Sequence, residues 1–421
     1  KSSARFDNDF LEGWANDGEV IGELARFSPV LAEYVERQGL QKLVTLEIPK
    51  LETFKPDKAP EEARIVVQSI HPNYDFLKRT GRTSSFAPKH YPGINIQQIP
   101  RGFLLEDGSM VEPRRCYLPR NDGWLICSCD YGTLELVTFA QKCYSTFGRS
   151  VLREAINSGK DAHAYLASVL AYELDNDFYS LSRSLVGAKL DRDATYEVFY
   201  SLKKGSDDEK KFYKKWRSLA KPVGLALPGG LGAETLIQVA RVVYGVTIES
   251  IDQAKRLKTI WGDCYPEGPE WLRYVPDKCK DDVNSTEEDE KLAYFTSLGM
   301  YRAGCDFCAA CNGAALQAPA GEGCKVSIFE VTRACYDPEM HSCLLGCLPG
   351  AFVHDELLVH LPNDQWAHER SFEISRIMVD SMKVICPDVK VTAEPALAYR
   401  WDKNMEPVFK DGRLVPWESA S

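Results

Sequence analysis

Three titratable residues interrupt an apolar run in the stretch FVHDELLVH, residues 352–360. His354, Asp355 and Glu356 have residues that favour β-strands on both sides. Charge at such a place is costly unless the side chain faces solvent, pairs with an opposite charge or holds a cation. The stretch predicts two strands joined by a turn, and a chemical or electrostatic task for the side chains in that turn.

A second acid, Asp130, ends the apolar strand predicted at 124–129. An acid at a strand end is commonly a turn or helix-cap residue, and that explanation covers Asp130 and Asp355 taken one at a time. Taken together, two carboxylates at adjacent strand ends of one sheet can hold two divalent cations, about 3.5–4 Å apart, that stabilise an in-line phosphoryl displacement. The sequence spacing leaves both interpretations open.

The net charge of −10 argues against a protein that coats nucleic acid indiscriminately. A local basic channel is still compatible with it, because salt limits the reach of each charge to about 8–10 Å. Basic residues gather in KKGSDDEKKFYKKWRSLAK (203–221) and PRRCYLPR (113–120). Taken alone, the first of these stretches has the composition of a solvated helix face.

The length of 421 residues allows a large core and two or three subdomains. The composition, 44% hydrophobic and 27% charged, is that of a globular protein. No apolar run reaches the roughly 20 residues that span a bilayer. The N-terminus, KSSARFDNDF, has no signal-peptide pattern and no initiator Met, which is compatible with a fragment of a longer protein.

Fourteen cysteines occur mostly in apolar contexts such as LICSCD. In a chain of this length they indicate reduced thiols in a cytosol rather than a disulfide scaffold. A CxxCxxC spacing could bind a metal, and one cluster has it: Cys305, Cys308 and Cys311, with Cys343 and Cys347 further on. No His follows at ligand spacing, and a spacing of three puts the first three thiols near one helix face. We expect buried packing, with a metal site as the alternative.

The apolar periodicity predicts helices and strands in an α+β arrangement. Strands are expected at IVVQSIHP, at 124–129 and on both sides of the turn in 344–361. Helices are expected in 1–45, LELVTFAQKCY, SVLREAINSGKDAHAYLASVLAYEL, a segment from about 210, 233–246, 303–316, 325–335 and 366–384. The segment 80–101 is irregular, 275–292 is an acidic loop, and 174–210 lacks the pattern of a core element. Pro222 should kink the helix that starts near 210, and Pro228-Gly229-Gly230 should end it.

Five stretches, in the same order, resemble the polymerase domain of family A DNA polymerases. TGRTSS with INIQQIPR (80–85, 94–101) is similar to the family's TGRLSS…LQNIP, and DYGTLEL (130–136) to motif A, DYSQIEL. RSLAKPVGLALPGG (217–230) resembles motif B, LQAPAGEGCK (316–325) the MQGTAADIIK helix, and VHDEL (353–357) motif C. The resemblance implies an α+β right-hand polymerase, with an antiparallel palm sheet, helical fingers and a partial thumb.

The resemblance implies a catalytic role for Asp130 and Asp355, which would carry two magnesium ions together with the backbone carbonyl of Tyr131. Magnesium prefers oxygen ligands and often binds through one or two carboxylates plus substrate phosphates. His354 and Glu356 would flank the primer terminus, and for Glu356 a structural role is an equally good alternative. The reaction implied is the transfer of a deoxynucleoside monophosphate to a primer 3′-end with release of pyrophosphate.

Residues of and around motif B would bind the incoming nucleotide. Arg217 and Lys221 lie four residues apart and so point from one helix face, a guanidinium for the outer phosphates and a point charge for the inner ones. Leu225 stands at the position of the aromatic that packs against the incoming sugar. Glu135 matches the acid that excludes a ribose 2′-hydroxyl. Lys214 belongs to the solvated helix face instead.

Arg82 and Gln317 match positions that reach the minor groove at the primer–template end, where acceptors are nearly independent of sequence. The family's Asn four residues before Gln317 is Gly313 here, and Asn312, one position off, either takes its place or does not. Motif B is the poorest match, because Gly229 replaces a Tyr that stacks near the templating base. The form KPxGLxxPGGLG is similar to a variant found in some phage polymerases of the family, which indicates a viral lineage.

The implied subdomains are a partial thumb in 1–65, the palm in 66–150 and 293–421, and the fingers in 151–292. The interval before motif B is longer than usual around 174–210, which implies enlarged fingers. Any proofreading exonuclease of the native protein would lie upstream. We expect a DNA-directed DNA polymerase of viral or bacterial replication in the cytoplasm of a bacterium or infected host. Its expected partners are primer–template DNA and dNTPs, with no membrane and no identified processivity factor.

Two other functions compete with this hypothesis. A single-subunit RNA polymerase shares the palm and both aspartates, but it has a small residue in place of Glu135 and HDS in place of HDE. A catalytically inactive DNA-binding relative is disfavoured because both aspartates, Arg217 and Lys221 are present. Ribonucleotide incorporation would identify the first, and salt-dependent binding of primer–template without extension would identify the second.

Overall fold

The computed structural model describes most of the chain from residue 72 to residue 418. The described residues are 72–76, 78, 81–86, 95–99, 102–104, 110–187, 191–286, 289–402 and 404–418. The predicted thumb, the helices expected in 1–45 and all but the last residue of the strand IVVQSIHP lie outside them. Within the described ranges no helix is both long enough and apolar enough to cross a membrane.

The chain divides into two compact units. The first unit runs up to Gly132 and also contains Gly323–Met382 and the residues from Thr392 onward. The second unit contains Thr133–Glu322 and Lys383–Val391. These bounds differ from the residue ranges expected for thumb, palm and fingers, so that assignment stays a prediction.

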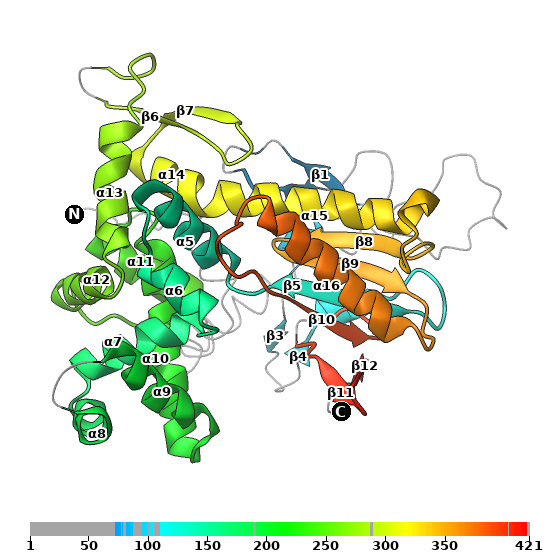
Figure 1. Cartoon of the computed structure of the whole chain (residues 1–421), viewed down its shortest axis with the longest axis horizontal. Coiled ribbons are helices and arrows are strands. Elements are labelled where there is room, and N and C mark those ends of the chain that lie inside the picture. Colours follow the sequence, from blue (N-terminus) through cyan, green and yellow to red (C-terminus); the bar gives the residue numbers. More distant parts are fainter. Residues whose placement is uncertain are drawn as a thin grey trace, which may run out of the picture. The chain divides into compact units, whose positions relative to one another are not determined.

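A six-stranded sheet forms the centre of the first unit (Figure 1). Its strand order is β11 (Val408–Lys410), β12 (Arg413–Trp417), β10 (Ala393–Ala398), β5 (Leu125–Tyr131), β9 (Glu356–Leu361) and β8 (Leu348–Val353). Neighbouring strands are antiparallel except for β10 and β12, which are parallel. The predicted antiparallel sheet is therefore present, with one parallel pair that the sequence did not indicate.

Strand β5 lies between β10 and β9, which explains its unbroken apolar run. Its residues from Leu125 to Cys129 are all buried, as expected for a strand covered on both faces. The Tyr131 hydroxyl donates to the backbone carbonyl of Met378 in α16 (Ala367–Lys383) at 2.6 Å. It also lies 2.5 Å from the hydroxyl of Ser327 in α15 (Ala318–Tyr336). Both helices therefore pack against this strand.

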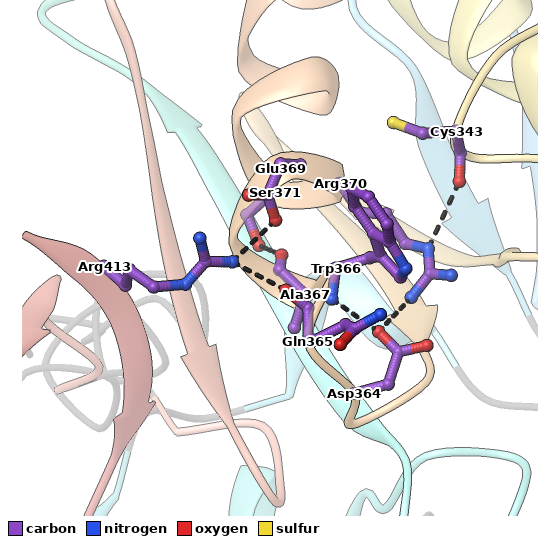
Figure 2. A network of polar contacts seen from close by, with 9 residues as sticks. All are labelled: Cys343, Asp364, Gln365, Trp366, Ala367, Glu369, Arg370, Ser371 and Arg413. Atoms are coloured by element: carbon purple, nitrogen blue, oxygen red, sulfur yellow. Dashed lines mark hydrogen bonds and ion pairs between the residues drawn. The ribbon is translucent and has the colours of Figure 1, made fainter.

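Polar contacts at the start of α16 join this helix to strand β12 and to the loops that contain Asp364 and Cys343 (Figure 2). The Arg413 guanidinium, from β12, forms an ion pair with Glu369 at 2.8 Å. On the other side of the helix start, Arg370 pairs with Asp364 at 2.6 Å and donates to the backbone carbonyl of Cys343 at 3.2 Å. The Arg413–Glu369 pair therefore ties β12 to α16, and the Arg370 contacts tie the loops around Asp364 and Cys343 to the same helix.

Shorter elements complete the first unit. They are β1 (Asn73–Asp75), β2 (Ser84–Phe86), η3 (Ile96–Gln98), β3 (Phe103–Leu104), β4 (Met110–Val111), η4 (Pro113–Cys116) and η7 (Pro338–Met340). The segment 80–101, expected to be irregular, therefore contains a strand and a helical turn. Ile96 and Ile99 pack in one cluster with Val353 of β8 and Trp401, so this segment supports the sheet near the end of β8.

The second unit is mainly helical. Its elements are α5 (Leu134–Phe147), α6 (Val151–Asn157), α7 (Ala162–Leu174), α8 (Asn176–Val186), α9 (Arg192–Ser201), η5 (Leu202–Lys204), α10 (Asp207–Ala226), α11 (Ala233–Tyr244), α12 (Ile251–Cys264), α13 (Glu267–Lys278), β6 (Leu292–Phe295), β7 (Tyr301–Cys305) and α14 (Phe307–Asn312). Helix α13 shows that the acidic loop begins only after Lys278.

The prediction that 174–210 contains no core element is wrong. Helices α8 and α9 occupy most of this segment, and they bury aromatic residues that are spaced among charges. Phe178 and Phe199 pack edge to face, with ring centroids 5.7 Å apart, and Phe199 also lies 5.1 Å from Tyr213 of α10. A few large aromatic side chains bury enough area to form a core even where most neighbours are polar.

Helix α10 runs through Pro222 to Ala226 and ends before the Pro228-Gly229-Gly230 turn. The predicted end is confirmed, and the helix is continuous through Pro222, where the expected kink stays a prediction. The helix begins with a capping box in which the Ser206 and Glu209 side chains each bond the other's backbone N–H. Burial of Pro222 and its neighbours offsets the backbone hydrogen bond that a proline cannot donate.

Candidate active site

Two residues of the first unit form the tight turn between β8 and β9. Val353 pairs with Glu356, so His354 and Asp355 alone connect the strands. His354 has φ of 63°, in the left-handed region that two-residue hairpin turns require and that residues other than glycine seldom adopt. The predicted strand–turn–strand is confirmed, and the turn fixes where Asp355 stands.

Asp130 lies beside this turn on the neighbouring strand. In the β5–β9 ladder Asp130 is opposite Glu356, and the Tyr131 backbone N–H donates to the Asp355 carbonyl at 3.4 Å. The pKa of the buried Cys324 thiol is affected by both carboxylates. Its pKa is raised well above the usual value, first by burial and then by the negative charges of Asp355 and Asp130. The structure therefore brings the two predicted aspartates together at one end of adjacent strands.

Two cations of the first unit affect the pKa of the same thiol. The positive charges of Arg82 and Lys325 lower the pKa of Cys324, although burial and the carboxylates outweigh them. The Lys325 ammonium donates to the backbone carbonyl of Gly81 at 2.9 Å, which links α15 to the segment that carries Arg82. Arg82 was predicted from the sequence. Lys325 was missed, although it ends the LQAPAGEGCK match.

Glu356 points into the protein. Its side chain is 5% exposed, and its Oε1 atom accepts hydrogen bonds from the Ser128 hydroxyl at 2.6 Å and the Trp401 indole N–H at 3.0 Å. Of the two roles left open by the sequence, this geometry favours the structural one. Trp401 is a residue that sequence reasoning missed, and no local pattern marks it as a partner of Glu356.

The side chain of Tyr131 is also engaged, through its contacts with Ser327 and Met378. A contribution of Tyr131 to a nucleotide or metal site is left to its backbone carbonyl, as the resemblance implies.

The predicted phosphate-binding residues lie on α10 in the second unit. The Arg217 Nη2 and Nε atoms lie 2.8 and 3.0 Å from Oδ2 of Asp161, the residue before α7. The pKa of the buried His163 is lowered to about 4, first by burial and then, against the charge of Asp161, by the charges of Arg217 and Lys221. The charges of Arg217 and Lys221 therefore both lower the pKa of a histidine in the first turn of α7. Sequence reasoning missed Asp161 and His163.

Similar proteins were found among curated sequences, whereas no protein-family model matches the chain. DNA polymerase I of Aquifex aeolicus is 23% identical over 388 residues, which cover 91% of this chain and 54% of that protein. DNA polymerase I of Lactococcus lactis subsp. lactis is 29% identical over 155 residues, which are 37% of this chain and 15% of that protein. The chain thus spans about half the length of the first relative and less of the second.

A solved structure shares the fold. It is the POL domain of Pol1 from M. smegmatis in complex with DNA primer-template and dNTP, with a TM-score of 0.57 and 21% identity. The match covers 92% of this chain and 56% of that one. The resemblance to family A DNA polymerases is confirmed. The fold is the right-hand polymerase fold expected from the sequence.

The two glycines that end motif B differ in how closely they are surrounded. A Cβ atom at Gly229 would lie 3.4 Å from the Ala226 carbonyl oxygen and 3.5 Å from Nδ2 of Asn312, which is ordinary van der Waals contact. Gly230 has φ of 86°, and a Cβ there would meet the ring of Phe307 at 2.8 Å. Leu225 is half-buried near the end of α10.

A π-helical segment, Gly313–Gln317, joins α14 to α15. The helices expected at 303–316 and 325–335 are thus one uninterrupted helical run. Because π-helical hydrogen bonds span five residues where α-helical ones span four, the five-residue interval from Asn312 to Gln317 is the counterpart of the family's four-residue interval. This geometry favours Asn312 as the replacement. A Cβ at Gly313 would collide with the Tyr294 hydroxyl, so the family's Asn does not fit there.

Glu135 lies half-buried in the first turn of α5. Among the described residues no group of three or more His, Cys, Asp or Glu side chains could hold an ion. Cys305 ends β7, so it does not share a helix face with Cys308 and Cys311, contrary to the prediction. All fourteen cysteines are free and most are buried, but Cys308 and Cys343 of the cluster are exposed, contrary to the expected burial.

Proposed function

We propose that the chain is a template-directed DNA polymerase that adds deoxynucleoside monophosphates to a primer 3′-end. The observation that carries this proposal is the pair Asp130 and Asp355, which strand pairing holds at the ends of adjacent strands. Both carboxylates raise the pKa of the same buried thiol, Cys324. The relatives named DNA polymerase I support it. The phage-like form of motif B points to viral or bacterial DNA replication.

The two aspartates have the donor chemistry that Mg²⁺ requires. Asp130, Asp355 and the backbone carbonyl of Tyr131 offer only oxygen atoms, which Mg²⁺ prefers, and magnesium needs few protein ligands when phosphates supply the others. When bound, two ions would activate the primer hydroxyl and stabilise the leaving pyrophosphate. The fixed turn at His354 and Asp355 would supply the preorganisation that such a site needs.

The other predicted residues would orient the substrates. Arg217 and Lys221 would bind the triphosphate, and Leu225 would pack against its sugar. Glu135 would exclude a 2′-hydroxyl by occupying its place. His354 would flank the primer end, while Glu356 would hold the turn from beneath.

Three predicted residues would contact the duplex. Arg82, Asn312 and Gln317 would each contact the minor groove of primer–template DNA, where donors can test pair shape without reading sequence. We assign the palm to 66–150 and 293–421, the fingers to 151–292 and a partial thumb to 1–65. A cytoplasmic location agrees with fourteen free cysteines.

The test is extension of a labelled primer on a DNA template with magnesium. We expect extension with dNTPs, little with rNTPs, and none with the Asp355→Ala variant. Equal extension with rNTPs would favour an RNA polymerase and refute the role of Glu135. Extension that survives in Asp355→Ala would refute the metal site. Tight binding of primer–template without extension by the wild type would indicate an inactive relative.

A further inference from the structure

The carboxylate of Asp161 binds the guanidinium of Arg217, which the proposed function assigns to a phosphate group. Oδ2 of Asp161 accepts two N–H groups of Arg217, at 2.8 and 3.0 Å, while Oδ1 accepts the Ala164 N–H and so caps α7. The two side chains are 29% and 23% exposed, so solvent screens the pair only in part. Burial would raise the pKa of Asp161, but the charge of Arg217 and the cap hydrogen bond lower it below its usual value. Asp161 is therefore a carboxylate anion beside Arg217 at neutral pH.

Two buried polar atoms stand near this ion pair. Nδ1 of His163 and the hydroxyl of Tyr213 have no hydrogen-bond partner among the described residues, and their side chains are only 6% and 5% exposed. The pKa of Tyr213 is raised to about 12, first by burial and then by the charge of Asp161. Buried polar groups are normally hydrogen-bonded, and leaving them unpaired costs free energy. Oxygen atoms of a bound ligand would give these two groups hydrogen-bond partners.

A second cation affects His163. Lys221, one turn after Arg217 on α10, lowers the pKa of His163 together with Arg217. Arg217 and two polar atoms that have no hydrogen-bond partner among the described residues thus lie close to a single carboxylate. One carboxylate oxygen cannot serve all of these groups, whereas a phosphate chain offers more acceptors and more charge.

We propose that Asp161 is an internal counter-anion that holds Arg217 until a phosphate group displaces it. The inference rests on the proposed function, because it takes Arg217 to be a phosphate ligand. A ligand shifts such an equilibrium only through its preference for one state, so the exchange favours polyphosphates over weaker anions. Asp161 thereby lowers the affinity for every anion and lets only a highly charged one compete. It acts through Arg217 and is not itself a ligand of the nucleotide.

The Asp161→Asn variant isolates this effect. Asparagine is as good a helix cap as aspartate, so its side-chain oxygen can still accept the Ala164 N–H. The anion that competes for Arg217 is removed. We expect the affinity for inorganic triphosphate to rise about 3- to 10-fold, the range that a partly screened, doubly hydrogen-bonded ion pair represents.

The matched control is Asp193→Asn, which makes the same change of charge nearby. Asp193 pairs with Lys160 at 2.7 Å and not with Arg217. Binding of inorganic triphosphate to the full chain is measured by titration calorimetry for the wild type, both single variants, Arg217→Gln and Asp161→Asn with Arg217→Gln. We expect the gain in Asp161→Asn alone, and no gain when Arg217 is also replaced.

Four results would overturn the inference. Unchanged or weaker binding by Asp161→Asn would mean that Asp161 positions Arg217 for phosphate or has no effect on it. An equal gain in Asp193→Asn would reduce the effect to long-range charge. A gain that persists without Arg217 would place the competition elsewhere. If neither the wild type nor any variant bound triphosphate, Arg217 would not be part of a phosphate site.

Primer extension, measured separately, distinguishes this failure from failure of the proposed function. If the chain extends primers, Asp161→Asn should lower the KM for dNTP by the same 3- to 10-fold and leave kcat unchanged. A fall in kcat with an unchanged KM would contradict a counter-anion role even in an active polymerase.

Discussion

The acids of the first unit and the cations of the second are positioned in different ways. Asp130 and Asp355 stand where strand pairing puts them, through the β5–β9 ladder and a two-residue turn. Arg217, by contrast, is held at its tip by the side chain of Asp161. Main-chain pairing leaves a carboxylate little freedom, whereas an ion pair between side chains can exchange its partner. The first arrangement suits a permanent metal site, and the second suits a ligand that arrives and leaves.

The cost of ordering the side chains agrees with this comparison. Fixing an arginine costs up to about 2 kcal/mol of side-chain entropy, which an aspartate with its short side chain largely avoids. The Asp161 contact provides part of that ordering before a phosphate binds. Variants that remove charge from each unit should therefore differ in which kinetic constant they change.

The largest effect is expected from the first unit. Asp130→Asn and Asp355→Asn should each lower kcat about 10³-fold or more, because metal-ion stabilisation of the transition state is worth several kcal/mol. Primer–template binding should persist, since the strand pairing does not need the charge. The comparison would fail if either variant lost DNA binding along with activity, or kept more than a tenth of the wild-type kcat.

Each unit also contains one histidine whose pKa is lowered to about 4 by burial, and these should make both units sensitive to acid. His163 lies in the second unit and His360 in the first, where the charge of Arg120 adds to the effect of burial. An unfolded histidine titrates near 6.5, so between about pH 6.5 and 4 the unfolded state binds more protons. Stability is therefore complete above this window and falls as the pH drops through it.

For His163 the loss at low pH approaches about 3 kcal/mol. Thermal unfolding at pH 7 and pH 4.5 measures it. The His163→Gln variant should have a smaller difference between the two midpoints than the wild type, whatever its stability at pH 7. An unchanged difference would mean that His163 is protonated in the folded protein.

In the second unit, Arg217→Gln should lower kcat/KM for dNTP about 10- to 100-fold, the range of a charge-assisted hydrogen-bond pair. Most of the change should appear in KM, because the proposed phosphate contact is lost while Asp130 and Asp355 are unchanged. Lys214→Gln removes one positive charge from the exposed face of the same helix and should have little effect. Similar losses in both variants would indicate that only the general charge of α10 matters.

Features set by neighbouring residues were predictable, and features set by distant partners were not. The turn at His354 and Asp355 follows from apolar strands around three polar residues, and the end of α10 follows from Pro228-Gly229-Gly230. The pair of Asp161 with Arg217 joins residues 56 apart, and no local pattern encodes it. The continuation of α10 through Pro222 was not predictable locally, because burial of a helix can offset the preference of a proline.

The parallel strand β12 and the core of 174–210 were missed for the same reason. β12 is short, and the segment between it and its parallel partner β10 contains another short strand, β11. The aromatic residues of α8 and α9 are interrupted by charges, so their common face appears only after they pack on α10. The right-hand fold was nevertheless predictable, because five motifs in order carry more information than the periodicity of any one element.

The smallest expected effect tests how firmly the first unit holds its turn. Trp401→Phe removes the indole N–H that bonds Glu356 at 3.0 Å and leaves the Ser128 bond in place. If Glu356 supports the turn beside Asp355, kcat should fall about 2- to 5-fold with no change in the KM for dNTP, which corresponds to roughly 1 kcal/mol for one hydrogen bond.

The second unit supplies a matched control for this variant. Trp271 is as fully buried as Trp401, but its indole N–H has no hydrogen-bond partner among the described residues. Trp271→Phe therefore removes similar packing without removing a hydrogen bond, and kcat should stay at the wild-type value. Equal losses in the two variants would mean that buried volume, and not the bond to Glu356, controls the turn. In that case strand pairing alone would position Asp355, without any side-chain hydrogen bond, whereas Arg217 is positioned by the side chain of Asp161.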